Sequence, residues 1–262
     1  MHGERLNDGL SAVAVGDGPP LVVLPGLGRG ADLSERVPRL AVGPNAAVAR
    51  GLGRTVHLIN RPVNPPPGMT IAELAEWYAT ALRDRFPEPA DVMGSSAGGV
   101  TALQLALDHP GVVGRLVLCG AASRVGEQGM RGLVEVMELE RQGRSAARLG
   151  SSLVADGPLR LLMWAAMAIA PKRPSAPGEA ALVAAARTWD VTGRLGELRA
   201  PVLLVSGSRD RLVPPELLRA TAAAIPDAHL VMLSGRGHLS ASFDRRATRE
   251  IRTFLARPTL PA

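Results

Sequence analysis

Short apolar runs alternate with longer segments of helical pattern along most of this chain. The runs are rich in Val, Leu and Ile, and they occupy residues 21–24, 55–59, 90–93, 116–119, 202–205 and 229–233. Helical periodicity between them indicates helices over about 33–52, 70–86, 97–109, 215–225 and 242–256. Continuous apolar strands joined by helices are typical of sheets that are buried on both faces. The sequence therefore predicts an α/β fold with a mostly parallel sheet and helices on both of its faces.

One stretch, residues 124–197, breaks this alternation and contains no convincing strand. It holds a charged helical segment, an apolar segment with Met163, Trp164 and Met167, a proline-rich break and a further helical segment. An all-helical insertion between two strands suggests a cap over one edge of the sheet. We therefore expect an α/β core of residues 1–123 and 198–262, with a helical cap at 124–197.

Composition argues against several classes of partner. The 262 residues suffice for one large domain with a sizeable core. The formal charge of +6 comes almost entirely from arginines scattered through amphipathic stretches, and Lys172 is the only lysine. Aromatic residues make up 3% of the chain, which leaves few platforms for stacking bases or sugars. We expect solvated helix faces rather than a nucleic-acid surface.

Targeting and redox signals are also sparse. Cys119 is the only cysteine, so no intrachain disulfide can form, and its apolar surroundings predict a buried strand residue. The first residues lack the apolar region of a signal peptide. The most apolar segment, at 159–170, is shorter than the roughly 20 residues that span a bilayer, and it contains Arg160. We expect a cytoplasmic protein with no membrane partner, and oligomeric state stays open.

A strand runs directly into a helix at residues 92–100, with Ser96 at the turn. Gly94, Ser96 and Gly98 form a Gly-x-Ser-x-Gly pattern, which lets strand and helix approach closely around a strained serine. The pattern alone is weak because Gly and Ser are common in loops, but its place between strand and helix strengthens it. Ser96 is the candidate nucleophile, and Ser95 is the competing hydroxyl.

A serine hydroxyl needs a neighbouring base to act as a nucleophile at neutral pH. His238 lies in a glycine-rich loop just after the last predicted strand. The other four histidines lie in the N-terminal tail, in or beside strands, or at a helix end: His2, His57, His109 and His229. His238 is therefore the candidate base.

The imidazole needs a carboxylate to orient it. Asp210 lies in the loop that follows the strand at 202–205, shortly before His238. Asp190 is the rival, although it occupies the junction where the predicted cap rejoins the core, and Asp227 fits a turn. We expect Asp210 to be the acid.

The negative charge of a tetrahedral intermediate needs hydrogen-bond donors. The backbone N–H of Ala97 is one candidate, because it follows the nucleophile. The N–H of Leu27, in the glycine-rich loop after the strand at 21–24, is the other. A phosphate-binding loop would fit such glycines, but the Gly-x-x-x-x-Gly-Lys-Ser/Thr signature is absent.

With these residues in place, the chain resembles the α/β-hydrolase superfamily over roughly residues 10–257. The order Ser96, Asp210, His238 matches its serine hydrolases, residues 25–28 match the oxyanion loop, and 207–214 and 235–238 match the acid and histidine loops. Two departures stand out. Residues 25–26 are Pro-Gly where many members have His-Gly, and Asn60-Arg-Pro replaces an Asp-x-Arg-Gly run.

The combined expectation is an esterase-like hydrolase that forms an acyl-enzyme on a small, mainly apolar substrate and needs no metal or organic cofactor. Met163, Trp164 and Met167 would shape the substrate pocket or pack between cap and core. Two alternatives stay open. The first is a ligand-binding protein that keeps this fold with little turnover. The second is hydrolysis of a C–C, lactone or amide bond, or acyl transfer, by the same triad.

Overall fold

A computed structural model describes residues 3–28, 32–34, 51–170 and 176–257. All six predicted apolar runs form strands of one sheet, and neighbouring strands among them run parallel. These strands are β3 (Pro20–Leu24), β4 (Thr55–Asn60), β5 (Ala90–Ser95), β6 (Val113–Cys119), β7 (Val202–Gly207) and β8 (Ala228–Leu233). The predicted α/β fold with a mostly parallel sheet is confirmed.

Two further strands complete the sheet at one edge. β1 (Glu4–Arg5) and β2 (Ser11–Val15) are antiparallel to their neighbours, and the strand order is β1-β2-β4-β3-β5-β6-β7-β8. Sequence analysis missed both strands. β1 has only two residues, and β2 is a small-residue segment whose pairing with β4 depends on residues more than forty positions away.

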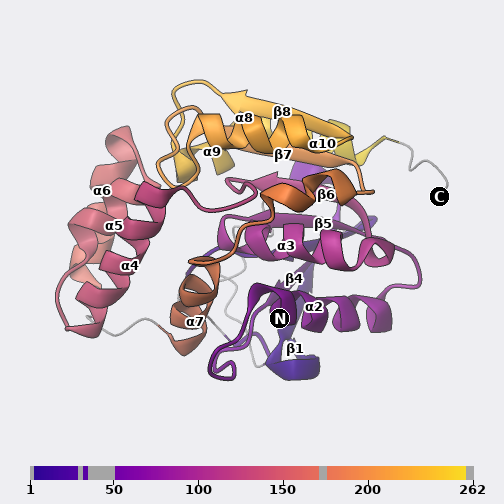
Figure 1. The fold of residues 1–262 in the computed structure, drawn as a ribbon, viewed down its shortest axis with the longest axis horizontal. Helices are drawn as coiled ribbons and strands as arrows, with labels where there is room; N and C mark the ends of the chain where they lie inside the picture. Colours follow the sequence, from indigo (N-terminus) through magenta and orange to yellow (C-terminus); the bar gives the residue numbers. More distant parts are fainter. Residues whose placement is uncertain (1–2, 29–31, 35–50, 171–175, 258–262) are drawn as a thin grey trace.

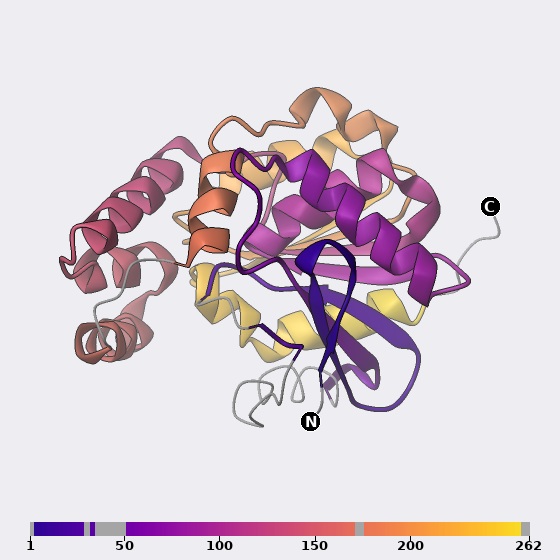
Figure 2. The same ribbon diagram turned by 90° about the horizontal axis from the view of Figure 1, so that it is seen from below.

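Helices cover both faces of the sheet (Figures 1 and 2). α2 (Ile71–Arg85), α3 (Ala97–Asp108) and α8 (Pro215–Ala224) lie on one face, and α9 (His238–Ser242) and α10 (Arg245–Leu255) lie on the other. Alternate strand residues point to opposite faces. Val22 and Leu24 accordingly join the core under α2 and α3, whereas Leu21 and Val23 join the core under α10.

The predicted helix boundaries are close, with one exception. The helix predicted at 242–256 begins three residues later, at Arg245, because the separate short helix α9 ends at Ser242 and α10 begins after Asp244. The Asp244 carboxylate accepts the Arg246 N–H at 2.8 Å and so caps a new helix. The helix predicted at 33–52 lies largely outside the described residues.

Between β6 and β7 the chain forms an insertion of helices: α4 (Glu127–Arg141), α5 (Ala147–Val154), α6 (Gly157–Ile169) and α7 (Pro177–Ala186). A short 3-10 helix, η3 (Thr192–Glu197), then leads into β7. α4, α5 and α6 lie to one side of the sheet, and α7 lies between them and the core (Figure 1). Within the described ranges, no helix is both long and apolar enough to cross a membrane.

A cluster of buried ion pairs lies at the start of β5, at the opposite end of the strand from Ser96. The two Asp91 oxygens accept hydrogen bonds from Arg115 at 2.8 and 2.9 Å, and one of them also accepts from Arg54 at 3.1 Å. Asp91 is 7% exposed and Arg54 9%. The carboxylate therefore compensates two largely buried guanidinium groups.

Replacing Asp91 with alanine is expected to destabilise the fold by about 3–5 kcal/mol, because two buried charges lose their partner. Urea denaturation at pH 7 measures this. Glu138→Ala is the control, since Glu138 pairs with Arg141 on an exposed helix face, and its urea midpoint should stay near that of the wild type. Equal midpoints for the two variants would contradict the stabilising role of the cluster.

Candidate active site

Ser96 lies at the turn between β5 and α3 in a backbone conformation that side chains rarely adopt. Its φ is 52° and its ψ is −120°. Its N–H donates to the Cys119 carbonyl at 2.8 Å, and its own carbonyl accepts from the Gly99 N–H at 2.8 Å. These bonds offset the strain and hold the side chain above the carboxyl end of the sheet.

Close packing at this turn explains the flanking glycines. A Cβ on Gly98 would lie 2.1 Å from the Leu24 carbonyl oxygen, and one on Gly94 would lie 2.6 Å from the Gly98 oxygen. Neither position can carry a side chain without moving backbone. The Gly-x-Ser-x-Gly spacing is therefore a packing requirement of the turn that presents Ser96.

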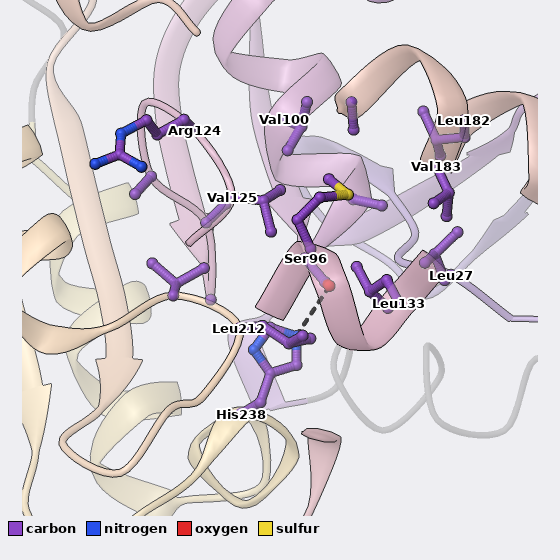
Figure 3. A pocket seen from close by; sticks show the side chains of 17 residues that line it. Leu27, Ser96, Val100, Arg124, Val125, Leu133, Leu182, Val183, Leu212 and His238 are labelled. Atoms are coloured by element: carbon purple, nitrogen blue, oxygen red, sulfur yellow. Dashed lines mark hydrogen bonds between the residues drawn. The ribbon is translucent and has the colours of Figure 1, made fainter. Parts of the chain in front are cut away.

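His238 begins α9, on the opposite side of the sheet from α3, and its ring reaches Ser96. Its Nε2 lies 2.9 Å from Ser96 Oγ (Figure 3). Gly120, at the end of β6, makes room for the ring, because a Cβ there would lie 2.8 Å from His238 Cε1. Gly120 also has a φ of 62°, which favours glycine.

Asp210 completes the line of hydrogen bonds. Its Oδ2 lies 2.7 Å from His238 Nδ1, and the carboxylate side chain is fully buried. Its Oδ1 accepts the N–H groups of Leu212 at 2.9 Å and Val213 at 3.0 Å, and Ser206 Oγ donates to Oδ2 at 2.9 Å. A carboxylate is only an acceptor, so His238 Nδ1 carries the proton and Nε2 is free to accept from Ser96.

The rival side chains have other partners. Asp190 accepts a backbone N–H two residues further on at 2.8 Å, as a turn residue does. His57 packs edge-on against Phe86, with ring centroids 5.1 Å apart. His109 Nε2 lies 3.1 Å from a Glu76 oxygen. The structure thus brings Asp210 and His238 to Ser96 and leaves these alternatives elsewhere.

A narrow apolar pocket opens beside Ser96. Its volume is about 30 Å³. Ser96 and His238 lie side by side in its wall, joined by a hydrogen bond (Figure 3). The remaining walls are almost entirely apolar. They come from the loop after β3, the segment between β6 and α4, the helices α3, α4 and α7, and the loop after β7: Leu27, Val100, Val125, Met130, Leu133, Leu182, Val183, Ala186, Leu212 and Val213. The pocket in this conformation is small, and its walls are mainly apolar.

The residues expected to shape this pocket do not line it. Met163, Trp164 and Met167 lie on α6, the outer helix of the insertion. Trp164 is 45% exposed, and Met167 packs over Gly150 of α5. Their role in shaping the substrate site therefore stays a prediction, since among the described residues none of the three lines the pocket beside Ser96. Sequence pattern marked α6 as the most apolar segment but could not show which helix faces the core.

The two proposed oxyanion donors flank Ser96. Ala97 is the first residue of α3, so its N–H has no acceptor within the helix. Leu27 lines the pocket, and the loop before it passes close to the serine, since a Cβ on Gly26 would lie 3.8 Å from Ser96 Oγ. Neither N–H takes part in the loop and turn hydrogen bonds of the described residues.

No other chemistry is evident near this site in the described part of the chain. No group of three or more His, Cys, Asp or Glu side chains is placed there to hold a metal ion. Cys119 is a partly buried strand residue, as its sequence context suggested, and burial raises the pKa of its thiol to about 12. The thiol is therefore protonated at neutral pH.

Comparisons with known proteins agree with this architecture. The model of the alpha/beta hydrolase fold family matches residues 19–244. RutD of Variovorax paradoxus, provisionally named a carbamate hydrolase, is 28% identical over 220 residues, which are 81% of this chain and 80% of that protein. The pimeloyl-[acyl-carrier protein] methyl ester esterase of Aromatoleum aromaticum is 28% identical over 240 residues, covering 84% and 91%.

Among solved structures, the enol-lactonase of Burkholderia xenovorans LB400 superimposes with a TM-score of 0.76 at 21% identity, covering 95% of this chain and 96% of that one. At this identity the likeness concerns the fold alone. The family match, by contrast, spans most of the chain and includes Ser96, Asp210 and His238. The chain belongs to the α/β hydrolase fold family.

Proposed function

We propose that this chain is a serine hydrolase that cleaves an ester-type bond of a small, mainly apolar substrate through an acyl-enzyme. The observation that carries the proposal is the continuous line from Ser96 Oγ through His238 to Asp210, with distances of 2.9 and 2.7 Å. Both distances suit strong hydrogen bonds. The arrangement has the three parts that an activated serine requires: nucleophile, base and orienting acid.

The proposed reaction has two halves. Ser96 Oγ attacks the substrate carbonyl while His238 Nε2 takes the proton of the serine hydroxyl. The new oxyanion accepts hydrogen bonds from the N–H groups of Leu27 and Ala97. The imidazolium then gives the proton to the leaving alcohol, which departs and leaves the acyl group on Ser96. A water molecule, deprotonated by His238, attacks the acyl carbonyl. The bond between the acyl carbon and Ser96 Oγ then breaks, His238 returns the proton to Oγ, and the acid is released. Asp210 holds the ring and stabilises its positive charge throughout.

Two observations support an apolar acyl group in the substrate, and a third supports an ester bond. The pocket walls carry aliphatic side chains from α4 and α7. The pocket is narrow, which favours a short group. One relative is named as a methyl ester esterase, so ester cleavage occurs on a chain that aligns over 84% of this one. Carbamate and lactone cleavage would use the same three residues and are outcomes of substrate testing.

Covalent labelling tests the proposal directly. A fluorophosphonate should form a Ser96 Oγ–P bond with loss of fluoride, while His238 accepts the serine proton. Intact mass followed by peptide mapping should place one adduct on Ser96. A folded protein that does not react with the probe would argue for the alternative, a ligand-binding protein without turnover.

The pocket makes a specificity prediction. Leu133 of α4 lines it, and Leu133→Ala should shift the preferred p-nitrophenyl ester toward longer acyl chains by two to four carbons because each buried methylene needs space. Relative kcat/KM across acetate, butyrate, hexanoate and octanoate measures the shift. Leu161→Ala is the matched control, since Leu161 lies on α6 with 67% of its surface exposed. The same shift in both variants would mean that the pocket does not bind the acyl chain.

A further inference from the structure

The loop that carries Leu27 is held by a buried arginine outside the proposed triad. Arg61 follows β4, and its side chain is 5% exposed. Its Nη1 donates to the Gly26 carbonyl at 3.1 Å, and its Nη2 donates to the Gly28 carbonyl at 3.2 Å. The two acceptors flank Leu27. One guanidinium therefore holds the Gly26–Leu27 peptide group, which carries the proposed oxyanion donor, and the carbonyl of the residue that follows Leu27.

The hydrogen bond from Arg61 to the Gly26 carbonyl determines the direction in which the Leu27 N–H points. The Gly26 carbonyl and the Leu27 N–H belong to one planar peptide group, and in a trans peptide they point in opposite directions. Arg61 holds the carbonyl on its own side. The Leu27 N–H must then point away from Arg61, and the loop faces Ser96 there, because a Cβ on Gly26 would touch the Ser96 side chain at 3.2 Å.

A carboxyl group on α7 also takes part. We call Arg61 and Glu179 together the clamp, because both contact the loop of residues 26–28 or each other. Glu179 of α7 is 6% exposed, and its Oε1 lies 3.7 Å from Arg61 Nη2. A backbone contact from Gly28 also lowers the pKa of the Glu179 carboxyl group. Burial raises the pKa of Glu179, while the charge of Arg61 opposes that rise. Arg61 thus contacts both the loop, through its two terminal nitrogens, and the carboxyl group of Glu179 on α7.

The start of α7 is seated so that Glu179 can reach the loop. The Gly178 N–H donates to the Val63 carbonyl at 2.9 Å. A Cβ on Gly178 would lie 2.3 Å from the Pro62 carbonyl oxygen, so only glycine permits this approach. Three segments that are distant in sequence therefore meet here: residues 26–28, residues 61–63 and the first turn of α7.

Among the described residues, no other hydrogen bond or ion pair of the Arg61 side chain explains its burial. Its Nε is the one buried side-chain nitrogen or oxygen without a hydrogen-bond partner among the described residues. Both terminal nitrogens donate to carbonyls of the loop, and Nη2 also lies beside the Glu179 carboxyl group. Burying a guanidinium is costly unless its contacts are specific. The contacts that it makes are those that orient the loop.

We propose that Arg61 is a positioning residue that, together with Glu179, orients the Leu27 N–H for the transition state and couples α7 to the oxyanion loop. This inference rests on the proposed serine hydrolase function. It assigns no contact between Arg61 and substrate. Loss of the clamp should therefore weaken binding of the oxyanion without weakening binding of the uncharged substrate.

The test compares Arg61→Lys, Glu179→Gln and the wild type. Lysine keeps the charge but cannot donate to both loop carbonyls in one plane. Losing a whole oxyanion donor lowers kcat by about 10²–10³-fold, so its misorientation in Arg61→Lys should lower kcat by about 10–100-fold. KM should change by less than about threefold, because ground-state binding is retained. Glu179→Gln should act in the same direction with a smaller effect.

Two inhibitors distinguish misorientation of the Leu27 N–H from a general loss of active-site structure. An alkyl trifluoromethyl ketone forms a tetrahedral adduct with serine whose oxyanion needs the donors, whereas the matching methyl ketone binds uncharged. Affinity for the first should fall with kcat, and affinity for the second should stay constant. Asp91→Ala is the control for breaking a buried ion pair elsewhere, and it should leave both affinities unchanged.

Each outcome has a clear meaning. Unchanged kcat and ketone affinities in folded Arg61→Lys and Glu179→Gln would overturn the positioning role, as would equal losses for both ketones. If Arg61→Lys does not fold, Glu179→Gln decides by the same measurements. If the wild type itself neither hydrolyses esters nor binds the trifluoromethyl ketone, the serine hydrolase proposal fails and this inference fails with it.

Discussion

Ser96→Ala is expected to lower kcat for p-nitrophenyl ester hydrolysis by about 10⁴–10⁶-fold, the range seen when a serine nucleophile is removed from a complete triad. The physical reason is the loss of the only hydroxyl that the structure places 2.9 Å from His238 Nε2 within the described residues. Residual turnover would then come from water and from the oxyanion donors alone. Purified variant and wild type are compared at substrate concentrations above KM.

Ser95→Ala is the matched control because it removes a hydroxyl one residue away. Ser95 ends β5 and lines a different cavity, which also includes Cys119, on the far side of the turn. Its loss should leave kcat within about threefold of the wild type. Circular dichroism and urea midpoints should show both variants folded. More than one hundredth of wild-type kcat in Ser96→Ala would remove Ser96 from the nucleophile role.

The position of Ser96 could be predicted from sequence because its geometry is local. An apolar strand, two glycines and a helix within nine residues leave the chain few ways to turn. Asp210 and His238 were identified from a different regularity, namely that loops after parallel strands meet at one edge of the sheet. The structure brings the three side chains together. In the sequence, the only sign of this is that each of them lies in a loop that follows a strand.

The walls of the pocket could not be predicted in the same way. α4, α5 and α6 are all amphipathic or apolar, so pattern alone does not tell which one faces Ser96. α6 is the most apolar and yet lies outermost, with Ile169 86% exposed. Contacts across the insertion decide the matter, and they depend on loop paths that have no local signature.

Arg61 and Glu179 illustrate an intermediate case. In the sequence, the Asn60-Arg61-Pro62 run shows only a departure from the family pattern. Glu179 is the single charged residue in the otherwise small and apolar α7, Pro177–Ala186. A lone carboxylate on such a helix needs a buried partner. That signal predicts an ion pair, but only the structure identifies the partner and the loop that both residues hold.

Asp210→Asn is expected to lower kcat by about 10⁴-fold, with the fold intact. The Asp210 carboxylate accepts the His238 Nδ1–H at 2.7 Å, and this bond fixes the tautomer whose Nε2 can accept the serine proton. An amide can present its NH₂ group to Nδ1 instead. The ring then carries its proton on Nε2, where it faces Ser96 and cannot act as a base. The imidazolium of the transition state also loses its counter-charge.

Asp190→Asn provides the matched control, because Asp190 was the rival acid and the chemical change is identical. Its carboxylate caps a turn and lies 3.8 Å from Arg124, so its loss should change kcat by less than about threefold. Ser206 and the N–H groups of residues 212 and 213 still surround the Asp210 site in the other variant, which should keep its urea midpoint close to the wild type. A larger loss of kcat in Asp190→Asn than in Asp210→Asn would transfer the orienting role to Asp190. Since both variants keep Ser96 and the pocket, the ratio of their kcat values isolates what the buried carboxylate does for the histidine.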